Sequence, residues 1–424
     1  MAIAKPLSTI PPNQYWRCVK PSLRTSYDRL LKKGDIVKRT GIQASTYAYF
    51  YGVGCIDGAT DYIHPDKFGT DFEEITLTPK EVFELNPKSV TGHLISSGYN
   101  QGLDPEVFAV DAKGRVLPAF QFLPAKDATN GVVGAPFWDG FQAEFTTQPK
   151  VCFGWLGDEV QAGLRRVYEA ATLAKKGAKL VATPVLPVSM EDLATAAEEY
   201  VQFGCSPSKN VYGLRGNDLG NPRQLPIRFA GFHIHYSLPD PHPKQFVEKV
   251  VRLQDAILGP ILTSTLEGLE QPERRHFYGL AGEYRTPKYG VEYRVPSSAV
   301  LWHPAMVHLT LNAGRMALKL VMEGKEDLWE VEQDATIGTI NNLDVGEARR
   351  TLRANRRLLE GWLEAQYFNC KPAKIFDGLL MHGWRGLVEL DMVANWSLTG
   401  LWQTHTNNNK GTFAVFAKGQ GWMH

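Results

Sequence analysis

The chain has 424 residues, a formal net charge of +1 and a hydrophobic fraction of 43%. This length allows more than one domain with a large buried core, and the composition excludes a disordered or fibrous protein. The near-zero net charge gives no global bias toward nucleic acid or an anionic membrane.

The cysteines and the apolar segments indicate a compartment. The five cysteines (18, 55, 152, 205 and 370) are scattered and contain no C-x-x-C pair, which argues against a zinc ribbon or a disulfide framework and favours a reducing compartment. The first residues lack the apolar core of a signal peptide, and the most apolar run, 300–322, is interrupted by charged residues and histidines. We therefore expect a soluble, cytoplasmic protein.

The N-terminal part has the pattern of a small β module. Between residues 33 and 75, short strand-like pieces alternate with Gly and Asp turns, which predicts a small β-barrel or β-sandwich. A short helix is expected at 78–85, and the domain boundary near 85–97. The sequence thus predicts an arm and β module at 1–90 and a second domain at 98–424.

The second part alternates strands and helices. Residues 102–119 form a predicted hairpin, and 204–223 form a long Gly- and Asn-rich loop that could cover a substrate. Helices are expected at 156–182 with an end at Gly177, and at 189–202, 246–268, 304–322 and 347–364. A last hairpin is expected to turn at 408–411.

Several predicted strands carry chemically active residues two positions apart. Such residues point to the same face of a strand. They are Asp104 and Glu106, Gln142 and Glu144, His233 and His235, Glu283 and Arg285, and Glu292 and Arg294. One acid–arginine pair alone is typically a half-exposed salt bridge. Its repetition favours one shared site.

If these strands lie in one curved antiparallel sheet, their common face gathers four carboxylates, two imidazoles and two guanidiniums: Asp104, Glu106, Glu144 and Glu292, His233 and His235, and Arg285 and Arg294. Clustered carboxylates raise one another's pKa unless cations accompany them, and Mg²⁺ or Mn²⁺ would meet that need. Arginines beside such ions suit a phosphate. The pattern predicts a phosphoryl-transfer site, although the chain has no Walker or G-x-G-x-x-G motif.

Each of these residues also has a simpler interpretation. His233 and His235 could be core histidines, or could form a zinc site together with Asp104. Asp139 precedes a glycine and fits a turn. Lys288 lies between the two E-Y-R triplets, where it is either a turn residue or a phosphate contact in a nucleotide site.

Three motifs resemble segments of the glutamine synthetase superfamily. They are G-L-D-P-E-V-F-A-V-D with its acid-Pro-acid ligands, G-F-H-I-H-Y-S-L, and G-V-E-Y-R-V-P-S-S-A-V-L-W-H-P-A. Their order along the chain agrees, and the match covers roughly residues 98–320. The A-G-E-Y-R and G-V-E-Y-R pair resembles the phage-encoded carboxylate–amine ligases (amidoligases) of that superfamily. The implied fold is α+β, a glutamine-synthetase-like curved antiparallel sheet backed by helices.

The resemblance implies an enzyme that uses ATP and Mg²⁺ or Mn²⁺ to join a carboxylate and an amine through an acyl phosphate. It implies one metal held by Glu106 and Glu144, a second held by Asp104, His233 and Glu292, a nucleotide contact from His235, and catalytic roles near phosphate for Arg285, Glu292 and Arg294. The chain departs from the superfamily in having Asp at position 104. The second glutamate of the first metal set has no clear counterpart, and Asp139 is the candidate to replace it.

Other activities remain open at the level of the sequence. A guanidino-type phosphotransferase has a related fold, and an inactive virion or scaffold protein could keep the fold alone. The retained acids favour an active enzyme over a scaffold. The acid and the amine could be small molecules, peptides or proteins, and the enzyme could be an oligomer. No feature indicates a nucleic-acid or membrane partner, and a phage-encoded enzyme would work in the host cytoplasm.

Overall fold

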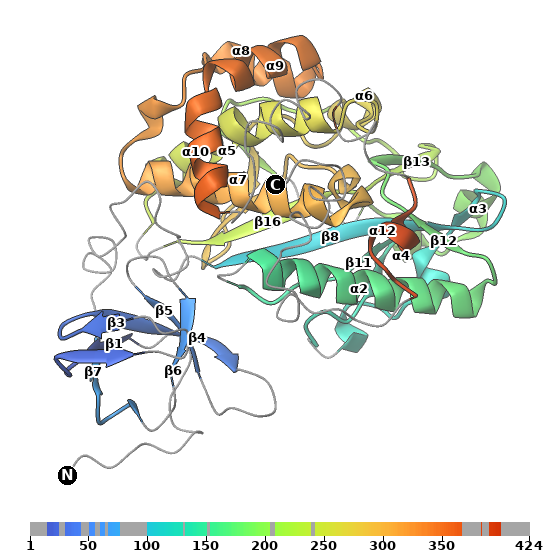
Figure 1. The fold of residues 1–424 in the computed structure, drawn as a ribbon. Helices are drawn as coiled ribbons and strands as arrows, with labels where there is room; N and C mark the ends of the chain where they lie inside the picture. The colour runs from blue at the N-terminus through green and yellow to red at the C-terminus, as the bar shows by residue number, and fades with distance from the viewer. Residues whose placement is uncertain are drawn as a thin grey trace.

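The computed structural model describes residues 15–24, 30–43, 51–55, 60–63, 67–76, 100–129, 132–150, 153–203, 208–238, 242–366, 383 and 390–399. The helix expected at 78–85, the boundary expected near 85–97 and the hairpin expected at 408–411 lie outside these residues. Figure 1 shows an N-terminal group of strands and a larger body of helices and strands.

The N-terminal strands form an open antiparallel sheet. Its order is β6 (Thr60–Ile63), β5 (Tyr51–Cys55), β4 (Ile36–Gln43), β1 (Tyr15–Cys18) and β7 (Phe72–Ile75), beside a separate pair of β2 (Ser22–Arg24) and β3 (Leu30–Lys32). Trp16, Val37, Phe68 and Phe72 form its core. The predicted barrel is not confirmed, because β6 and β7 remain unpaired edges within the part of the chain that the structure describes.

A nine-stranded antiparallel sheet forms the centre of the larger body. Its order is β10 (Phe137–Asp139), β11 (Gln142–Glu144), β8 (Gln101–Val110), β16 (Phe232–Ser237), β18 (Gly290–Tyr293), β17 (Glu283–Arg285) and β14 (Lys209–Asn210), and β9 (Val116–Leu117) and β12 (Lys179–Val181) pair with β8 as well. The predicted hairpin of β8 and β9 and the predicted large antiparallel sheet are therefore confirmed.

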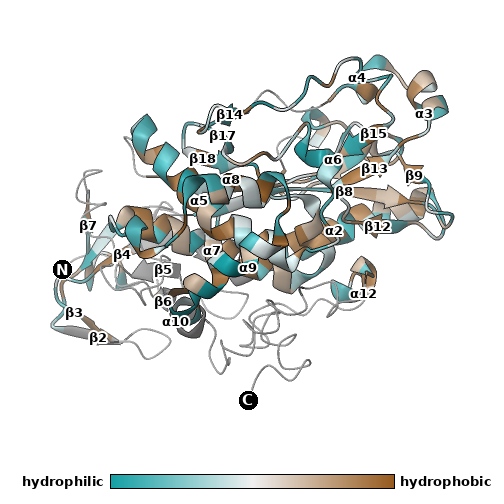
Figure 2. Cartoon of the chain, turned by 90° about the horizontal axis from the view of Figure 1, so that it is seen from above, coloured by the Kyte–Doolittle hydropathy of each residue, from teal (hydrophilic) through white to brown (hydrophobic). Residues whose placement is uncertain are grey.

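Three long helices cover one face of this sheet. They are α2 (Phe153–Ala174), α7 (Pro304–Met322) and α5 (Lys244–Thr265), with α7 in contact with both of the others (Figure 1). The hydrophobic colour in Figure 2 concentrates on β8, α2 and α7, whereas α6 (Pro272–Arg275) is hydrophilic. This layered arrangement with segregated helices is an α+β architecture.

Smaller elements complete the body. The remaining helices are α3 (Met190–Thr195), α4 (Glu198–Val201), α8 (Gln333–Asn341), α9 (Val345–Ala354), α10 (Arg356–Gln366) and α12 (Met392–Asn395). Short 3-10 helices are η4 (Ala119–Gln121), η5 (Asp127–Thr129), η6 (Ser298–Trp302) and η7 (Glu326–Leu328), and β13 (Val185–Pro187) pairs with β15 (Ile227–Phe229). None of the described helices is both long and apolar enough to cross a membrane.

Strand alternation decides which side chains remain for a site. Ile234, Tyr236 and Tyr293 are fully buried in the core beneath the helices. The hydroxyl of Tyr293 donates to Asp255 of α5 (2.7 Å), and that of Tyr236 donates to Gln254 of the same helix (3.1 Å). The residues between them, such as His235, therefore point to the opposite face.

Two predicted helices are each divided into two. The helix expected at 189–202 is interrupted at Ala196, whose backbone is extended, because the guanidinium of Arg223 binds the carbonyl oxygens that end α3. The helix expected at 347–364 begins at 345 and breaks at Asn355. The amide of Asn355 exchanges hydrogen bonds with the backbone of Glu330 (2.8 Å each), which holds this junction in place.

Candidate functional site

The central strands bring the paired residues of the sequence to one face. The registers oppose Glu144 with Glu106, Asp104 with His233, His235 with Glu292, and Glu292 with Arg285. Directly opposed residues of antiparallel strands project to the same side. The carboxylates, imidazoles and guanidiniums expected to share a face therefore do share one, opposite the helix layer.

Three acids form a compact cluster at one end of this face. Glu106, Asp139 and Glu144 each offer a carboxylate oxygen, and these oxygens all lie within 4.8 Å of one another. One opposing cation is the ammonium group of Lys126, whose Nζ lies 3.8 Å from Glu144. Oxygen ligands at this spacing suit a hard divalent cation.

Asp139 reaches the cluster through a tight hairpin. It pairs with Gln142 across β10 and β11, accepts a hydrogen bond from that amide (3.1 Å), and precedes Gly140, whose φ of 64° makes the turn. The Asp-Gly pair is thus a turn, as its simpler interpretation predicted. The same turn also delivers the carboxylate to the other two acids.

The pKa values of all three acids in the cluster are raised. Burial, followed by the charge of Asp139, raises the pKa of Glu106 to about 7. Burial, followed by the charges of Glu106 and Asp139, raises the pKa of Glu144 well above its usual range, and burial raises that of Asp139. A bound cation would remove this repulsion.

We expect the metal-free protein to lose stability as the pH rises. Carboxyls with a raised folded-state pKa bind protons more tightly in the folded than in the unfolded state. For Glu106, the stabilisation of the folded state by this proton is complete below the ordinary pKa of 4.5. It is lost as the pH rises through the folded-state pKa of about 7. Thermal melting of metal-free protein should therefore occur at a lower temperature at about pH 8 than at about pH 5.

Glu144→Gln tests the origin of that loss. At about pH 8 the substitution removes one repelling charge and should therefore raise the melting temperature of metal-free protein. It should also reduce the rise in melting temperature that Mn²⁺ produces in the wild type. Glu169→Gln on the exposed side of α2 is the control and should change neither quantity. An unaltered pH profile in Glu144→Gln would contradict this account.

The second group on this face is centred on Glu292. Its Oε1 forms a buried ion pair with Arg294 and lies 3.6 Å from Arg285 and 3.7 Å from Nδ1 of His233. The same Nδ1 lies 3.8 Å from Glu106, so His233 connects the two groups. Burial and the charge of Arg294 hold the pKa of His233 well below its usual range. The neutral imidazole keeps a lone pair for a metal ion.

Asp104 and His235 form a pair of their own. Nε2 of His235 lies 2.9 Å from Oδ2 of Asp104, while Nδ1 lies 2.6 Å from the hydroxyl of Tyr289. Of the expected metal set of Asp104, His233 and Glu292, Asp104 is therefore hydrogen-bonded to His235, which is outside the set. Lys288, next to Tyr289 in the turn before β18, is exposed.

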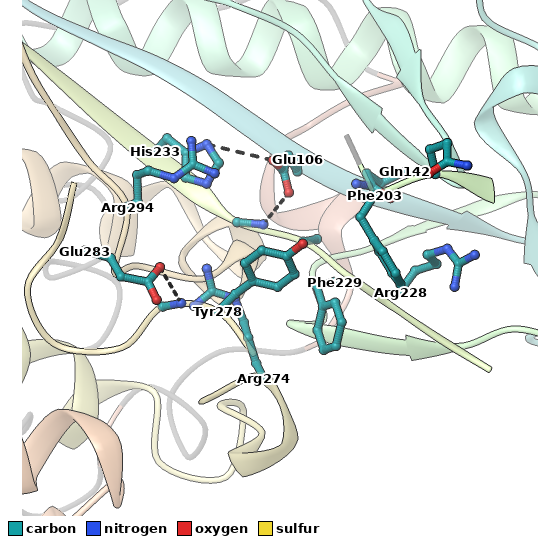
Figure 3. Close-up of a pocket in the computed structure, with 14 residues that line it drawn as sticks. Glu106, Gln142, Phe203, Arg228, Phe229, His233, Arg274, Tyr278, Glu283 and Arg294 are labelled. Atoms are coloured by element: carbon teal, nitrogen blue, oxygen red, sulfur yellow. Dashed lines mark hydrogen bonds and ion pairs between the residues drawn. The ribbon is translucent and has the colours of Figure 1, made fainter. Parts of the chain in front are cut away.

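A pocket adjoins these groups. Glu106 and His233 lie along one side of it, and Tyr278, Phe229 and Arg274 lie across from them (Figure 3). The expectations from the sequence did not include the last three residues. The double arginine at 274 and 275 becomes notable only in the structure, where both side chains are buried, because burying two adjacent guanidiniums is costly.

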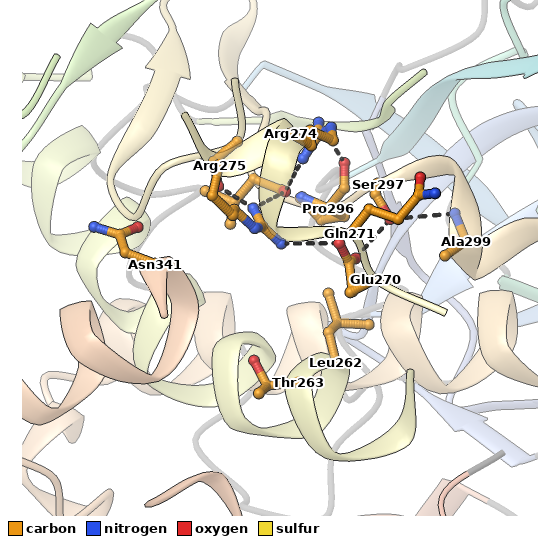
Figure 4. A network of polar contacts seen from close by, with 12 residues as sticks. Leu262, Thr263, Glu270, Gln271, Arg274, Arg275, Pro296, Ser297, Ala299 and Asn341 are labelled. Atoms are coloured by element: carbon orange, nitrogen blue, oxygen red, sulfur yellow. Dashed lines mark hydrogen bonds and ion pairs between the residues drawn. The ribbon is translucent and has the colours of Figure 1, made fainter. Parts of the chain in front are cut away.

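A buried polar network supports the segment that follows β18 and carries Arg294. Arg274 and Arg275 both donate to the carbonyl oxygen of Val295, the next residue, at 3.0 and 2.9 Å (Figure 4). The hydroxyl of Ser297 donates to Glu270 (2.6 Å). These contacts fix the chain where it leaves the sheet, so Arg294 has a rigid base.

An α+β sheet with clustered acids, histidines and arginines on the face opposite its three long helices has the groups of a metal- and phosphate-binding site. Residues 225–334 match the model of the family described as Phage phiEco32-like COOH.NH2 ligase-type 2. The match includes β16, β17 and β18, with His233, Glu292 and Arg294 among its residues. The predicted resemblance to the phage-type carboxylate–amine ligases is thereby confirmed over this segment.

Solved structures show weaker similarity. One is described as a novel glutamine synthase homolog (15% identity, 71% of this chain and 70% of that chain, TM-score 0.34). Another is the complex of the prokaryotic ubiquitin-like protein Pup with its ligase PafA (12%, 77% and 76%, 0.38), and a third is GmaS with ADP (14%, 72% and 71%, 0.33). TM-scores this low do not establish a common overall fold. The sequence matches none of the curated proteins.

Proposed function

We propose that this protein is an ATP-dependent carboxylate–amine ligase that forms an amide bond through an acyl phosphate. The observation that carries the proposal is the common face on which the acidic cluster, His233, Glu292 and Arg294 meet, within a chain whose residues 225–334 match a ligase family. Such a face can bind an anionic nucleotide and hold the reacting groups in place.

The donor set fits divalent metal ions. Glu106, Asp139 and Glu144 would hold one ion. His233 and Glu292, which lie 3.7 Å apart, would hold another, together with Asp104 from the opposed position on β8. Carboxylates and one imidazole suit Mg²⁺ or Mn²⁺ better than a soft metal. Such ions, when bound, neutralise phosphate charge and bridge the nucleotide to the protein.

The arginines have the geometry to act on the transferred phosphoryl group. Arg294 is buried and Arg285 is partly exposed, with 29% of its side chain accessible, and both are directed toward Glu292. Arg285, His235 and the exposed Lys288 would contact the nucleotide, while Arg294 would stabilise the negative charge of the reacting group.

The proposed reaction has two steps. A carboxylate oxygen of the acid attacks the γ-phosphorus of ATP, the bond to the β-phosphate oxygen breaks, and ADP leaves. The amine nitrogen then attacks the acyl carbon, loses a proton, and phosphate departs. The pocket beside Glu106 would hold the acid or the amine, because its aromatic wall of Phe229 and Tyr278 can exclude water from the acyl phosphate.

The proposal extends to the organisation of the chain. Residues 1–90 would form an arm and a small β module, and residues 98–424 the ligase domain, acting in the host cytoplasm if a phage encodes it. The β module could recruit a macromolecular substrate. Deletion of residues 1–90 without any loss of activity on the true substrate would exclude that role.

Trapping with hydroxylamine tests the reaction. An acyl phosphate reacts with hydroxylamine to give a hydroxamate, so a panel of acids with ATP and Mg²⁺ or Mn²⁺ should yield hydroxamate and phosphate in equal amounts. Omission of the acid is the control. Phosphoryl transfer to a nitrogen without hydroxamate would indicate a guanidino-type kinase. Absence of nucleotide binding with either metal would favour a scaffold protein.

A further inference from the structure

Three side chains form a hydrogen-bonded line across the edge of the site. The hydroxyl of Tyr289 lies 2.6 Å from Nδ1 of His235, and Nε2 of His235 lies 2.9 Å from Oδ2 of Asp104. The line runs from the turn before β18, across β16, to β8. It joins a turn residue to an acid that the proposed function places at a metal ion.

The direction of the protons follows from the groups involved. The carboxylate of Asp104 accepts, so the fitting tautomer of His235 is the one that carries the ring proton on Nε2 and donates it. Nδ1 is then an acceptor, and the hydroxyl of Tyr289 donates to it. Removing this hydroxyl would leave the imidazole free to rotate or to adopt the other tautomer.

The backbone places Tyr289 over His235. Gly290 has a φ of 152°, and a Cβ at that position would overlap the carbonyl oxygen of Tyr236, so only glycine permits the turn to approach β16 this closely. The amide of Leu238 donates to the carbonyl oxygen of Tyr289 (2.9 Å). The turn is therefore attached directly to the strand that carries His235.

Packing does not account for the orientation of the Tyr289 ring. The side chain is 51% exposed, and its ring centroid lies 5.9 Å from that of His235 at an angle of 47°, which is not a stacked arrangement. The close contact between the two residues is the one from the Tyr289 hydroxyl to Nδ1 of His235 (2.6 Å). This geometry is expected of a residue that orients the imidazole.

We propose that Tyr289 is a positioning residue that, through His235, holds the carboxylate of Asp104 in the orientation a metal ion requires. The inference rests on the proposed function, since it needs an ion at Asp104. Groups hydrogen-bonded directly to a metal ligand usually affect metal affinity by about 10- to 100-fold. Tyr289 acts one hydrogen bond further away, so we expect the low end of that range, about 10-fold. The hydroxyl, not the ring, is the effective group.

Mn²⁺ binding to the full chain, measured by calorimetry and by the loss of the free-ion EPR signal, tests this role. Tyr289→Phe keeps the ring and Tyr289→Ala removes it, and both should weaken Mn²⁺ binding by about 10-fold without changing the melting temperature of metal-free protein. Tyr168→Phe on α2 is the matched control and should bind as the wild type does.

The outcomes separate the two proposals. A wild type that binds Mn²⁺, with unchanged affinity in Tyr289→Phe, would overturn the role of Tyr289 and leave the ligase intact. Weaker Mn²⁺ binding in Tyr289→Ala but not in Tyr289→Phe would also overturn the role of the hydroxyl, since the ring would then be the effective group. A wild type that binds no Mn²⁺ would overturn both this inference and the proposed metal site.

Discussion

Replacing Glu292 with glutamine is expected to abolish metal-dependent binding of an ATP analogue and to lower turnover by about 10³-fold. Glu292 is the residue on which the second group converges, because its Oε1 faces Arg294, Arg285 and His233 together. Glutamine keeps the shape of the side chain and removes its charge.

The size of the effect follows from what the amide cannot do. It cannot balance two guanidiniums, and it is a poor ligand for a divalent cation. Metal-ion catalysis contributes several kcal/mol, and each 1.36 kcal/mol corresponds to a factor of about ten in rate. Loss of one charged ligand therefore predicts a large fall in rate rather than a graded one.

Calorimetric titration of a non-hydrolysable ATP analogue with Mn²⁺ measures the binding. The matched control is Glu323→Gln, because Glu323 is also a buried carboxylate between two cations, Lys319 at 3.2 Å and Lys325 at 2.9 Å, at the end of α7. It should bind the analogue as the wild type does. Tight metal-dependent binding of the analogue to Glu292→Gln would show that Glu292 is not part of the nucleotide and metal site.

The sequence was informative where the site depends on strand periodicity. Acids, histidines and arginines two residues apart must share a face, so Asp104 with Glu106, and Glu292 with Arg294, could be grouped by their spacing in the chain. The order of the strands was beyond periodicity alone. The resemblance matched only the order of the motifs along the chain, and the pairing of His235 with Glu292 is a finding of the structure.

The sequence was less informative where a local pattern has two outcomes. Asp139 before a glycine predicts a turn whether or not the turn brings it to Glu106. Arg274 has the appearance of a surface charge, and its burial depends on the carbonyl oxygen of Val295, a contact that no side-chain pattern encodes. The break near Ala196 has the same origin, since Arg223 binds backbone oxygens there.

Replacing Arg294 with methionine is expected to lower turnover by about 10³- to 10⁵-fold, the range for an arginine that stabilises a transferring phosphoryl group. Arg294 is 3% exposed and forms the closest ion pair of the site, with Glu292, so its guanidinium is held in a fixed place before substrate arrives. Arg294→Lys should recover only part of the rate, because an ammonium lacks the planar fork.

The comparison with Arg285 shows whether Arg294 acts on the reacting group or on the bound nucleotide. Arg285 lies 3.6 Å from Glu292 with 29% of its side chain exposed, so Arg285→Met should weaken affinity for the ATP analogue more than it lowers single-turnover phosphate release. Arg294→Met should lower single-turnover phosphate release more than it weakens affinity for the ATP analogue.

Arg349→Met, which removes a peripheral pair with Glu267 (2.6 Å), controls for the loss of an arginine and should change neither the affinity nor the rate. Equal effects of the Arg285 and Arg294 substitutions on affinity and rate would mean that the two guanidiniums act as one phosphate-binding unit, and the catalytic role proposed for Arg294 would be wrong.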